Sequence, residues 1–216
     1  MLTRDYIMRM IDTLIRVLEK IFFLKEAKNY PEALKELDSL TKELLGMDSM
    51  FIHSLSDSQL VQIVDREGNL LAPKCYLIGV VFKEEAEIFM LQGNREGAAK
   101  LYMRSLYMFI AGVENSGVTV EKDHLKKIDD VIDKLSEYEL PADISGKLFF
   151  YYEFTGRFDK AEDILFNLID VDNAYLDRGI VFFKRLLQKS DKELGAGNLP
   201  RNEVEEGLAD LMNMKN

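Results

Sequence analysis

Apolar residues recur along most of the chain at three- and four-residue steps, the spacing of one face of an α-helix. The clearest example is the segment 82–109, in which two such apolar stripes are separated by a break at Gly93. Each stripe needs a partner surface, and small Ala86 in the first one lets a neighbouring backbone approach closely. We therefore predict that these two helices pack as an antiparallel hairpin.

The same spacing predicts helices over most of the remaining chain. All four prolines lie in predicted first helical turns, where the missing N–H costs nothing and the fixed φ suits the helix. Ser56 and Gln59 have the spacing of a capping box and mark a further helix start. No sustained two-residue alternation is present, so we expect an all-α protein of about nine to ten helices. Pro73 opens the first helix of the 82–109 hairpin, and Pro141 restarts the helical pattern ahead of 146–155. The other predicted helices cover residues 3–27, 30–46, 56–64, 120–135, 158–170, about 174–189 and 200–213.

Three of the predicted helix pairs are related by a regular offset. Ala33, Ala98 and Ala161 occupy equivalent positions, 65 and 63 residues apart, and each interval contains one further helix. The period is therefore three helices, or about 64 residues. The resulting plan has pseudo-repeats at about 3–66, 70–138 and 141–190, a linker at 195–198 and a C-terminal capping helix at 200–213. We expect them to form one domain over residues 1–216.

The 82–109 hairpin resembles a tetratricopeptide repeat (TPR). The aromatic, small and glycine positions of that repeat are matched by Phe82, Ala86, Phe89, Gly93, Ala98, Tyr102 and Ser105. Glu85 departs from the pattern, because the repeat usually has leucine there. The resemblance implies a TPR-like, right-handed superhelix of helical hairpins.

Nearly the whole chain also resembles a bacterial family of TPR-like proteins of unknown function and of this length. The resemblance rests on the start DYIMRMIDTL, the ending LPRNEVEEGLADL and the internal segment YYEFTGRFDKAEDILFNL. It implies the same helical-repeat fold. It brings no activity and no catalytic residues.

Composition indicates a globular chain and argues against nucleic acid as a partner. Hydrophobic residues make up 47% of the chain, which is enough for a continuous core, and charged residues make up 31%. The formal net charge of -10 opposes a phosphate backbone, whose binding needs clustered lysine and arginine. The single cysteine, Cys75, cannot form an internal disulfide, which fits a reducing compartment. Because the N-terminus also lacks a signal-peptide pattern, we expect a cytoplasmic protein.

The N-terminal helix has an unusually wide apolar face. Asp12, Arg16, Glu19 and Lys20 interrupt any apolar run of about 20 residues, so this helix cannot span a membrane. Its acidic residues also dilute the basic face that a surface-bound helix would use, which makes a membrane partner the lesser alternative. We expect a core position or a dimer interface instead.

Residues that could carry chemistry occur in this chain, but not in a recognisable arrangement. His53 and His124 have no second histidine or cysteine at metal-ligand spacing, and a structural zinc site needs four ligands. The apolar surroundings of Cys75 favour an inert buried thiol, unless the fold brings a histidine to it. We predict no catalytic residue, no cofactor site and no metal site, and no P-loop, GxSxG or GxGxxG motif occurs.

Two acidic sets also have a plain structural interpretation. Glu84, Glu85 and Glu87 form one set and 203–206 contains the other, and we expect most of these side chains to face water because adjacent helical residues diverge by about 100°. Glu85 is the exception, since it lies on the side that should pack. A calcium loop after Asp170 is excluded because the required glycine is replaced by Tyr175.

We predict a non-enzymatic protein or peptide interaction module whose groove is lined by the first helix of each hairpin, as the TPR resemblance implies. This projection gives the partner-binding residues Lys83, Glu87, Met90, Phe150, Glu153 and Phe154. The same projection in the first pair gives Ile15, Leu18 and Phe22. These three are too apolar for an open groove, so we predict that another helix or a second chain covers them.

Two alternatives stay open from the sequence. One is a small-molecule sensor or enzyme with an inter-helix pocket, in which Glu85, Tyr102 or His124 supplies a polar group. The other is a self-associating structural protein, a homodimer through the N-terminal helix.

Overall fold

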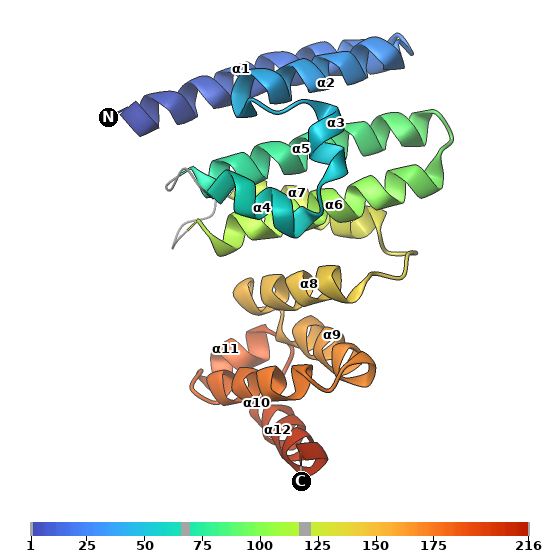
Figure 1. The fold of residues 1–216 in the computed structure, drawn as a ribbon. Coiled ribbons are helices and arrows are strands. Elements are labelled where there is room, and N and C mark those ends of the chain that lie inside the picture. Colours follow the sequence, from blue (N-terminus) through green and yellow to red (C-terminus); the bar gives the residue numbers. More distant parts are fainter. Residues whose placement is uncertain (1, 66–69, 117–121, 216) are drawn as a thin grey trace. The chain divides into compact units, whose positions relative to one another are not determined.

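A computed structural model describes residues 2–65, 70–116 and 122–215, and this part of the chain contains helices and no strand (Figure 1). The predicted all-α fold class is confirmed. Contacts divide the chain into two compact units, Met1–Tyr138 and Glu139–Asn216, called unit 1 and unit 2 below. The division falls between the second and third predicted pseudo-repeats. The single domain over 1–216 stays a prediction.

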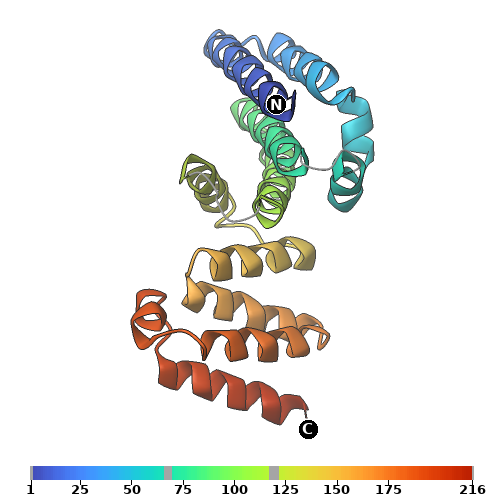
Figure 2. The ribbon, with the colours of Figure 1, turned by 90° about the vertical axis from the view of Figure 1, so that its left-hand side faces the viewer.

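Unit 1 is built around two long helical hairpins, α1–α2 and α5–α6, whose helices lie side by side (Figures 1 and 2). Short helices α3 and α4 follow α2, and α7 packs on α6. The bounds are α1 (Leu2–Glu26), α2 (Tyr30–Leu45), α3 (Ser49–Ser54), α4 (Asp57–Asp65), α5 (Leu71–Leu91), α6 (Arg95–Glu114) and α7 (Lys122–Lys134).

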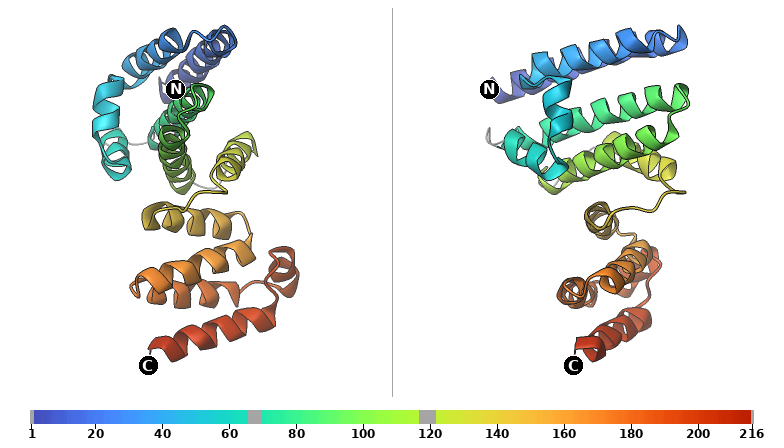
Figure 3. Two further views of the ribbon diagram at one scale, coloured as in Figure 1. Left: turned by 90° about the vertical axis from the view of Figure 1, so that its right-hand side faces the viewer. Right: turned by 45° about the vertical axis from the view of Figure 1, so that its right-hand side comes forward.

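Unit 2 contains one hairpin, α8–α9, followed by α10, which packs against both α9 and α12 (Figure 3). Its core includes Phe182, Phe183, Leu194 and Leu211, all fully buried. The bounds are α8 (Ala142–Phe154), α9 (Phe158–Val171), α10 (Tyr175–Leu186), α11 (Asp191–Ala196) and α12 (Arg201–Lys215).

The described residues form twelve helices, so the prediction of nine to ten is wrong. The two that were missed, α3 and α11, have six residues each and are held by their N-caps rather than by a long apolar stripe. Asp48 accepts a hydrogen bond from the backbone N–H of Phe51, and Ser190 forms a capping box with Glu193. Of the predicted linker at 195–198, residues 195–196 belong to α11, and residues 197–198 lie between α11 and α12.

The α1–α2, α5–α6 and α8–α9 hairpins turn through the same backbone conformation. Lys28, Gly93 and Gly156 have φ values of 56°, 81° and 74°, in the left-handed region. In each turn the next residue donates its backbone N–H to the carbonyl five residues earlier, over 2.8 Å, 2.9 Å and 2.8 Å respectively. This bond satisfies a carbonyl that the end of the helix leaves free. The three turns are 65 and 63 residues apart, the same spacing as the three alanines.

The α5–α6 hairpin is the most closely packed part of unit 1. Ala86 is fully buried, as predicted for a small residue in this stripe. A Cβ on Gly79 would lie 2.6 Å from a ring carbon of Phe109, so the two helices approach as closely as they do because residue 79 has no side chain. The hydroxyl of Ser105 donates a buried 2.7 Å hydrogen bond to the carbonyl of Gly79 across the same contact.

Helix α1 leaves part of its apolar face uncovered. Ile15 and Phe22 are exposed and Leu18 is half-buried, so no described helix of unit 1 covers the three residues for which we predicted such a cover. Coverage by a second chain stays a prediction. None of the described helices, α1 included, is long and apolar enough to cross a membrane.

Candidate functional site

Five of the six residues predicted to bind a partner line two separate hollows, one in each unit. Lys83 and Glu87 line a hollow of about 330 Å³ in unit 1, which we call the α5–α7 hollow. Its lining consists of Lys83, Glu87, Tyr102, Asp130, Asp133 and Lys134. Met90 is exposed on α5 and belongs to neither lining.

Unit 2 has a larger hollow of about 760 Å³, which we call the α8–α10 hollow. All three of the predicted residues on α8 belong to it. Its lining consists of Phe150, Glu153, Phe154, Arg185, Gln188, Lys189 and Glu193. The residues predicted from the sequence thus form one wall of each hollow. The other lining residues come from parts of the chain for which no role in binding was predicted.

Behind the α5–α7 hollow lies a cluster of four charged side chains. The ammonium group of Lys25, at the end of α1, donates hydrogen bonds of 2.7 Å to Glu84 and 2.6 Å to Glu87. Lys83 pairs with Glu87 as well. We expected most carboxylates of the two acidic sets to face water, and Glu203, Glu205 and Glu206 do. Glu84 and Glu87 do not, because a lysine 59 and 62 residues away in the sequence binds both carboxylates.

The charges of this cluster stabilise one another. Burial lowers the pKa of Lys25, but the hydrogen bonds with Glu84 and Glu87 outweigh this effect and the pKa is raised overall. Burial raises the pKa of Glu87, but Lys25 and Lys83 outweigh it and the pKa is lowered overall. Lys25 and Glu87 are therefore held in their charged forms, and the hydrogen bonds of Lys25 fasten the end of α1 to α5.

Tyr102, on α6, presents a hydroxyl group to the α5–α7 hollow. The residue is 4% exposed, and among the described residues its hydroxyl has no hydrogen-bond partner. Burial raises the pKa of Tyr102 to about 12, and the charges of Glu87 and Glu84 add to this. The hydroxyl is consequently neutral at physiological pH and able both to donate and to accept.

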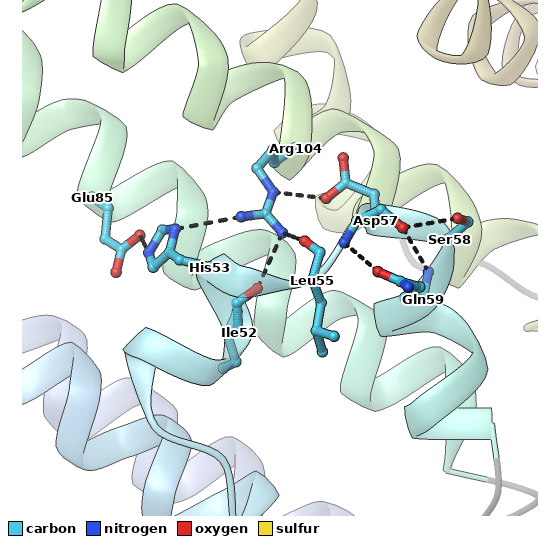
Figure 4. A network of polar contacts seen from close by, with 9 residues as sticks. Ile52, His53, Leu55, Asp57, Ser58, Gln59, Glu85 and Arg104 are labelled. Atoms are coloured by element: carbon cyan, nitrogen blue, oxygen red, sulfur yellow. Dashed lines mark hydrogen bonds and ion pairs between the residues drawn. The ribbon is translucent and has the colours of Figure 1, made fainter.

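A second polar network surrounds Arg104 and includes Glu85, the residue that departs from the repeat pattern (Figure 4). Arg104 Nε donates a 2.7 Å hydrogen bond to Asp57, and its Nη2 donates bonds of 3.2 Å and 2.9 Å to the carbonyls of Ile52 and Leu55. The guanidinium group also lies 4.2 Å above the centre of the Phe82 ring. These contacts fasten α3 and the start of α4 onto α5 and α6.

His53 connects this network to Glu85. Its Nε2 atom lies 2.9 Å from Oε2 of Glu85, and its Nδ1 lies 3.4 Å from Nη1 of Arg104 (Figure 4). The oxygen Oε2 is close to His53 but has no partner with full hydrogen-bond geometry. Glu85 is 5% exposed, which confirms that it lies on the packing side of its helix. The two ring nitrogens of His53 thus face Glu85 and Arg104 respectively.

His124 lies among aromatic rings. Its ring centroid is 4.6 Å from that of Tyr76 and 5.6 Å from that of Phe109. Burial lowers the pKa of His124 to about 4, the charge of Lys127 adds to this, and a hydrogen bond with the backbone of Phe109 opposes it. The imidazole is therefore neutral at pH 7.

Cys75 and His124 both border the same glycine, Gly112. An added Cβ on Gly112 would lie 3.6 Å from Cβ of Cys75 and 3.5 Å from Cε1 of His124. The fold thus brings a histidine to the neighbourhood of the cysteine, but the thiol is fully buried. No substrate reaches it, which supports the interpretation of Cys75 as a core residue.

The polar residues considered for a small-molecule pocket have different neighbours. Glu85 contacts His53, Tyr102 faces the α5–α7 hollow and His124 packs against aromatic rings. In the part of the chain that the structure describes, no three His, Cys, Asp or Glu side chains are arranged to hold a metal ion. The side chains that line the two hollows offer hydrogen bonds, charges and apolar contacts.

Comparison with known proteins gives one match. No curated protein and no solved structure matches the chain. The model of a family described as "Family of unknown function (DUF6483)" matches residues 1–216, the whole chain. The protein therefore belongs to this family of unknown function.

Proposed function

We propose that the protein is a non-enzymatic interaction protein and that its α8–α10 hollow receives an apolar side chain of a partner peptide. The observation that carries this proposal is the aromatic pair Phe150 and Phe154. Their ring centroids lie 5.9 Å apart with the planes inclined by 20°, and Phe154 is 43% exposed. A stacked aromatic pair left open in a hollow offers apolar area that a partner side chain can bury.

The polar residues of the hollow favour recognition of an apolar group rather than a charged one. Arg185 binds Glu153 through two hydrogen bonds of 2.7 Å, which fixes both side chains. Lys189 and Glu193 add one further charge of each sign, so the formal charges of the lining cancel. We accordingly expect an apolar anchor residue with polar neighbours in the partner peptide.

The proposal includes a TPR-like relation between the three hairpins. It is supported by the common left-handed turn at Lys28, Gly93 and Gly156 and by its spacing of 65 and 63 residues. In helical repeats the surface lined by equivalent helices is the usual binding face. Helices α5 and α8 are equivalent in this sense, and each contributes to a hollow.

The test begins with selection of peptides from a displayed library on the immobilised full-length protein. Dissociation constants of the selected peptides are then measured by fluorescence polarisation. Phe154→Ala removes one ring of the pair, and we expect it to weaken binding about 30-fold, the effect of losing a hot-spot residue. Val171→Ala is the matched control, because Val171 is also an exposed apolar residue of unit 2 but lies outside the hollow. Equal affinities for the two variants would refute the assignment of the hollow.

A second candidate function is self-association through α1. Five residues of this helix are spaced by alternate steps of three and four, as in the seam of a coiled coil. They are Met8, Ile11, Ile15, Leu18 and Phe22, and all except half-buried Leu18 are exposed. We propose a second copy of the same helix as the partner of this stripe, in the antiparallel orientation.

Charge complementarity supports the antiparallel pair. Asp12 and Glu19 flank the stripe on one side, and Arg9 and Arg16 lie one position further round the helix on that side. If a two-fold axis passes at the level of Leu14, Arg9 is level with Glu19 of the second copy and Asp12 is level with Arg16 of the second copy. In the same register the stripe residues of one copy fall between those of the other.

Light scattering across a dilution series tests this arrangement. Ile15→Asp should give a monomer, and Val171→Asp, the control in unit 2, should not. Arg9→Glu with Arg16→Glu, and separately Asp12→Arg with Glu19→Arg, should each weaken self-association, while an equimolar mixture of the two variants should associate again. If the wild type is strictly monomeric at a protein concentration of about 100 μM, the interface is eliminated, because that concentration is far above the Kd of a stable pair.

A further inference from the structure

The α5–α7 hollow has a lining unlike that of the α8–α10 hollow. Its residues are all polar, with two lysines, three carboxylates and one tyrosine contributed by α5, α6 and α7. At about 330 Å³ it lies at the small end of the range of ligand pockets. It belongs to unit 1, so what it binds is independent of the peptide proposed for unit 2.

The first indication of a ligand is the hydroxyl of Tyr102. The rest of this side chain is packed into the unit, yet the polar atom meets no partner among the described residues. Among the described residues, the buried side-chain atoms without a partner are Glu85 Oε2 and His124 Nε2, so the Tyr102 hydroxyl itself reaches the solvent of the hollow. Its hydrogen-bonding capacity is therefore available to a group that enters the hollow.

The second indication is the charge left after internal pairing. Lys25, Lys83, Glu84 and Glu87 bind one another, so two positive and two negative charges cancel. The hollow then keeps only the charges of α7. Of these, Asp130, Asp133 and Lys134 have no ion pair among the described residues, and their sum is one negative charge.

The hydrogen-bond acceptors that line the hollow indicate which chemical group it can bind. Asp130 and Asp133 are three residues apart on α7, which places their carboxylates on one face of the helix. Together with the oxygen of Tyr102 they supply three acceptors. A primary ammonium group has three N–H donors, carries the opposite charge and needs no further acceptor. The same side chains are not arranged to hold a metal ion.

We propose that the α5–α7 hollow binds a small organic ammonium ion, whose N–H groups donate to Asp130, Asp133 and Tyr102. Lys83, on α5, and Lys134, which follows Asp133 on α7, also line the hollow. Their positive charges disfavour a polycation and favour a ligand that also carries an acidic group. An aliphatic amino acid with separated ammonium and carboxylate groups therefore suits the hollow better than a diamine of the same length.

Calorimetric titration of the full-length protein tests this binding. The probes are 6-aminohexanoate, 1,4-diaminobutane and tetramethylammonium, which has the charge but no N–H donor. A fourth probe, N-acetyl-lysine amide, represents the lysine side chain of a peptide. We expect 6-aminohexanoate to bind more tightly than 1,4-diaminobutane, and tetramethylammonium to bind at least about ten-fold more weakly than either. If N-acetyl-lysine amide binds more tightly than both free amines, a partner protein rather than a small molecule supplies the ammonium group.

Tyr102→Phe is the decisive variant, because it removes the hydroxyl while keeping the ring and the net charge. The hydroxyl makes no bond within the described protein, so the variant should fold as the wild type does. We expect it to weaken 6-aminohexanoate about ten-fold, the effect of one hydrogen bond to a charged group, and Asp133→Asn to do the same. Glu205→Gln, an exposed site in unit 2, is the control for the loss of one negative charge. Three results would each overturn the proposal. They are an unchanged affinity for 6-aminohexanoate in Tyr102→Phe, an affinity for tetramethylammonium equal to that for 6-aminohexanoate, and no heat of binding from any amine at ~10 mM.

Discussion

Replacement of Glu162 by glutamine should stabilise unit 2 at alkaline pH. Burial raises the pKa of Glu162 to about 7, and the nearby charges of Asp163, Glu203 and Asp159 add to this. No hydrogen bond or ion pair to Glu162 occurs among the described residues. Its carboxylate therefore loses water on folding and gains only like charges as neighbours.

The sign of the pH dependence follows from the direction of the shift. A carboxyl group whose pKa is higher in the folded protein than the ordinary 4.5 favours folding while it is protonated in both states. This contribution of Glu162 to the free energy of unfolding is fully present below pH 4.5 and is lost as the pH rises through about 7. The difference between the two pKa values corresponds to roughly 3 kcal/mol at about 1.4 kcal/mol per pH unit. Partial exposure of the side chain screens the charges and reduces this to about 1–2 kcal/mol.

The assay is urea unfolding between pH 4.5 and 8, with hydrogen exchange of the α9 and α12 segments as the readout specific to unit 2. Glu162→Gln should raise the unfolding free energy by about 1–2 kcal/mol at pH 8 and by little at pH 4.5. Glu205→Gln, which removes an exposed carboxylate from α12, should have no pH-dependent effect. An equal gain for Glu162→Gln at both pH values, or an equal gain for the two variants, would refute the reasoning.

Three further predictions concern unit 1. Lys28→Gly should raise the unfolding free energy in urea by about 0.5–1 kcal/mol, because Lys28 has φ 56° and glycine adopts this conformation without strain; a loss of stability would contradict the left-handed turn. Lys25→Met should cost about 2 kcal/mol in the same assay, because it leaves two half-buried carboxylates without their shared cation, whereas Lys35→Met at an exposed pair should cost almost nothing. Because the pKa of His124 is lowered to about 4, the imidazole should destabilise unit 1 as the pH falls from 6.5 toward 4, and His124→Phe should remove this loss; identical pH profiles of circular dichroism would contradict it.

The three- and four-residue spacing of apolar residues was sufficient to predict the long helices, because each of them buries a stripe of apolar side chains over several turns. Helix α3 and helix α11 bury only Ile52 and Leu194 respectively, so they have no stripe to detect. Their signals are local caps. The predicted box of Ser56 and Gln59 is confirmed by bonds of 2.9 Å and 3.3 Å. The same pattern at Ser190 and Glu193 starts a helix of only six residues beside a glycine-rich segment, so it has no apolar stripe to support it.

The hollows could be predicted only in part, because a helical period identifies one wall and not the wall that faces it. Lys83 and Glu87 follow from the geometry of α5 alone. The partner of Glu87 at Lys25 and the facing residue Asp133 depend on how α1 and α7 pack, which no local spacing encodes. The left-handed turn at Lys28 could not be predicted from the sequence either, because the equivalent turns of the other two hairpins are marked by glycine, at Gly93 and Gly156.

Hydrogen exchange of the full-length protein with a selected peptide would test the interaction proposal most directly. If the peptide anchors on Phe154, slowed exchange should be concentrated in α8 and around Arg185 at the end of α10, and should disappear in Phe154→Ala. Slowed exchange that leaves α8 unchanged, or that persists in Phe154→Ala, would contradict the account.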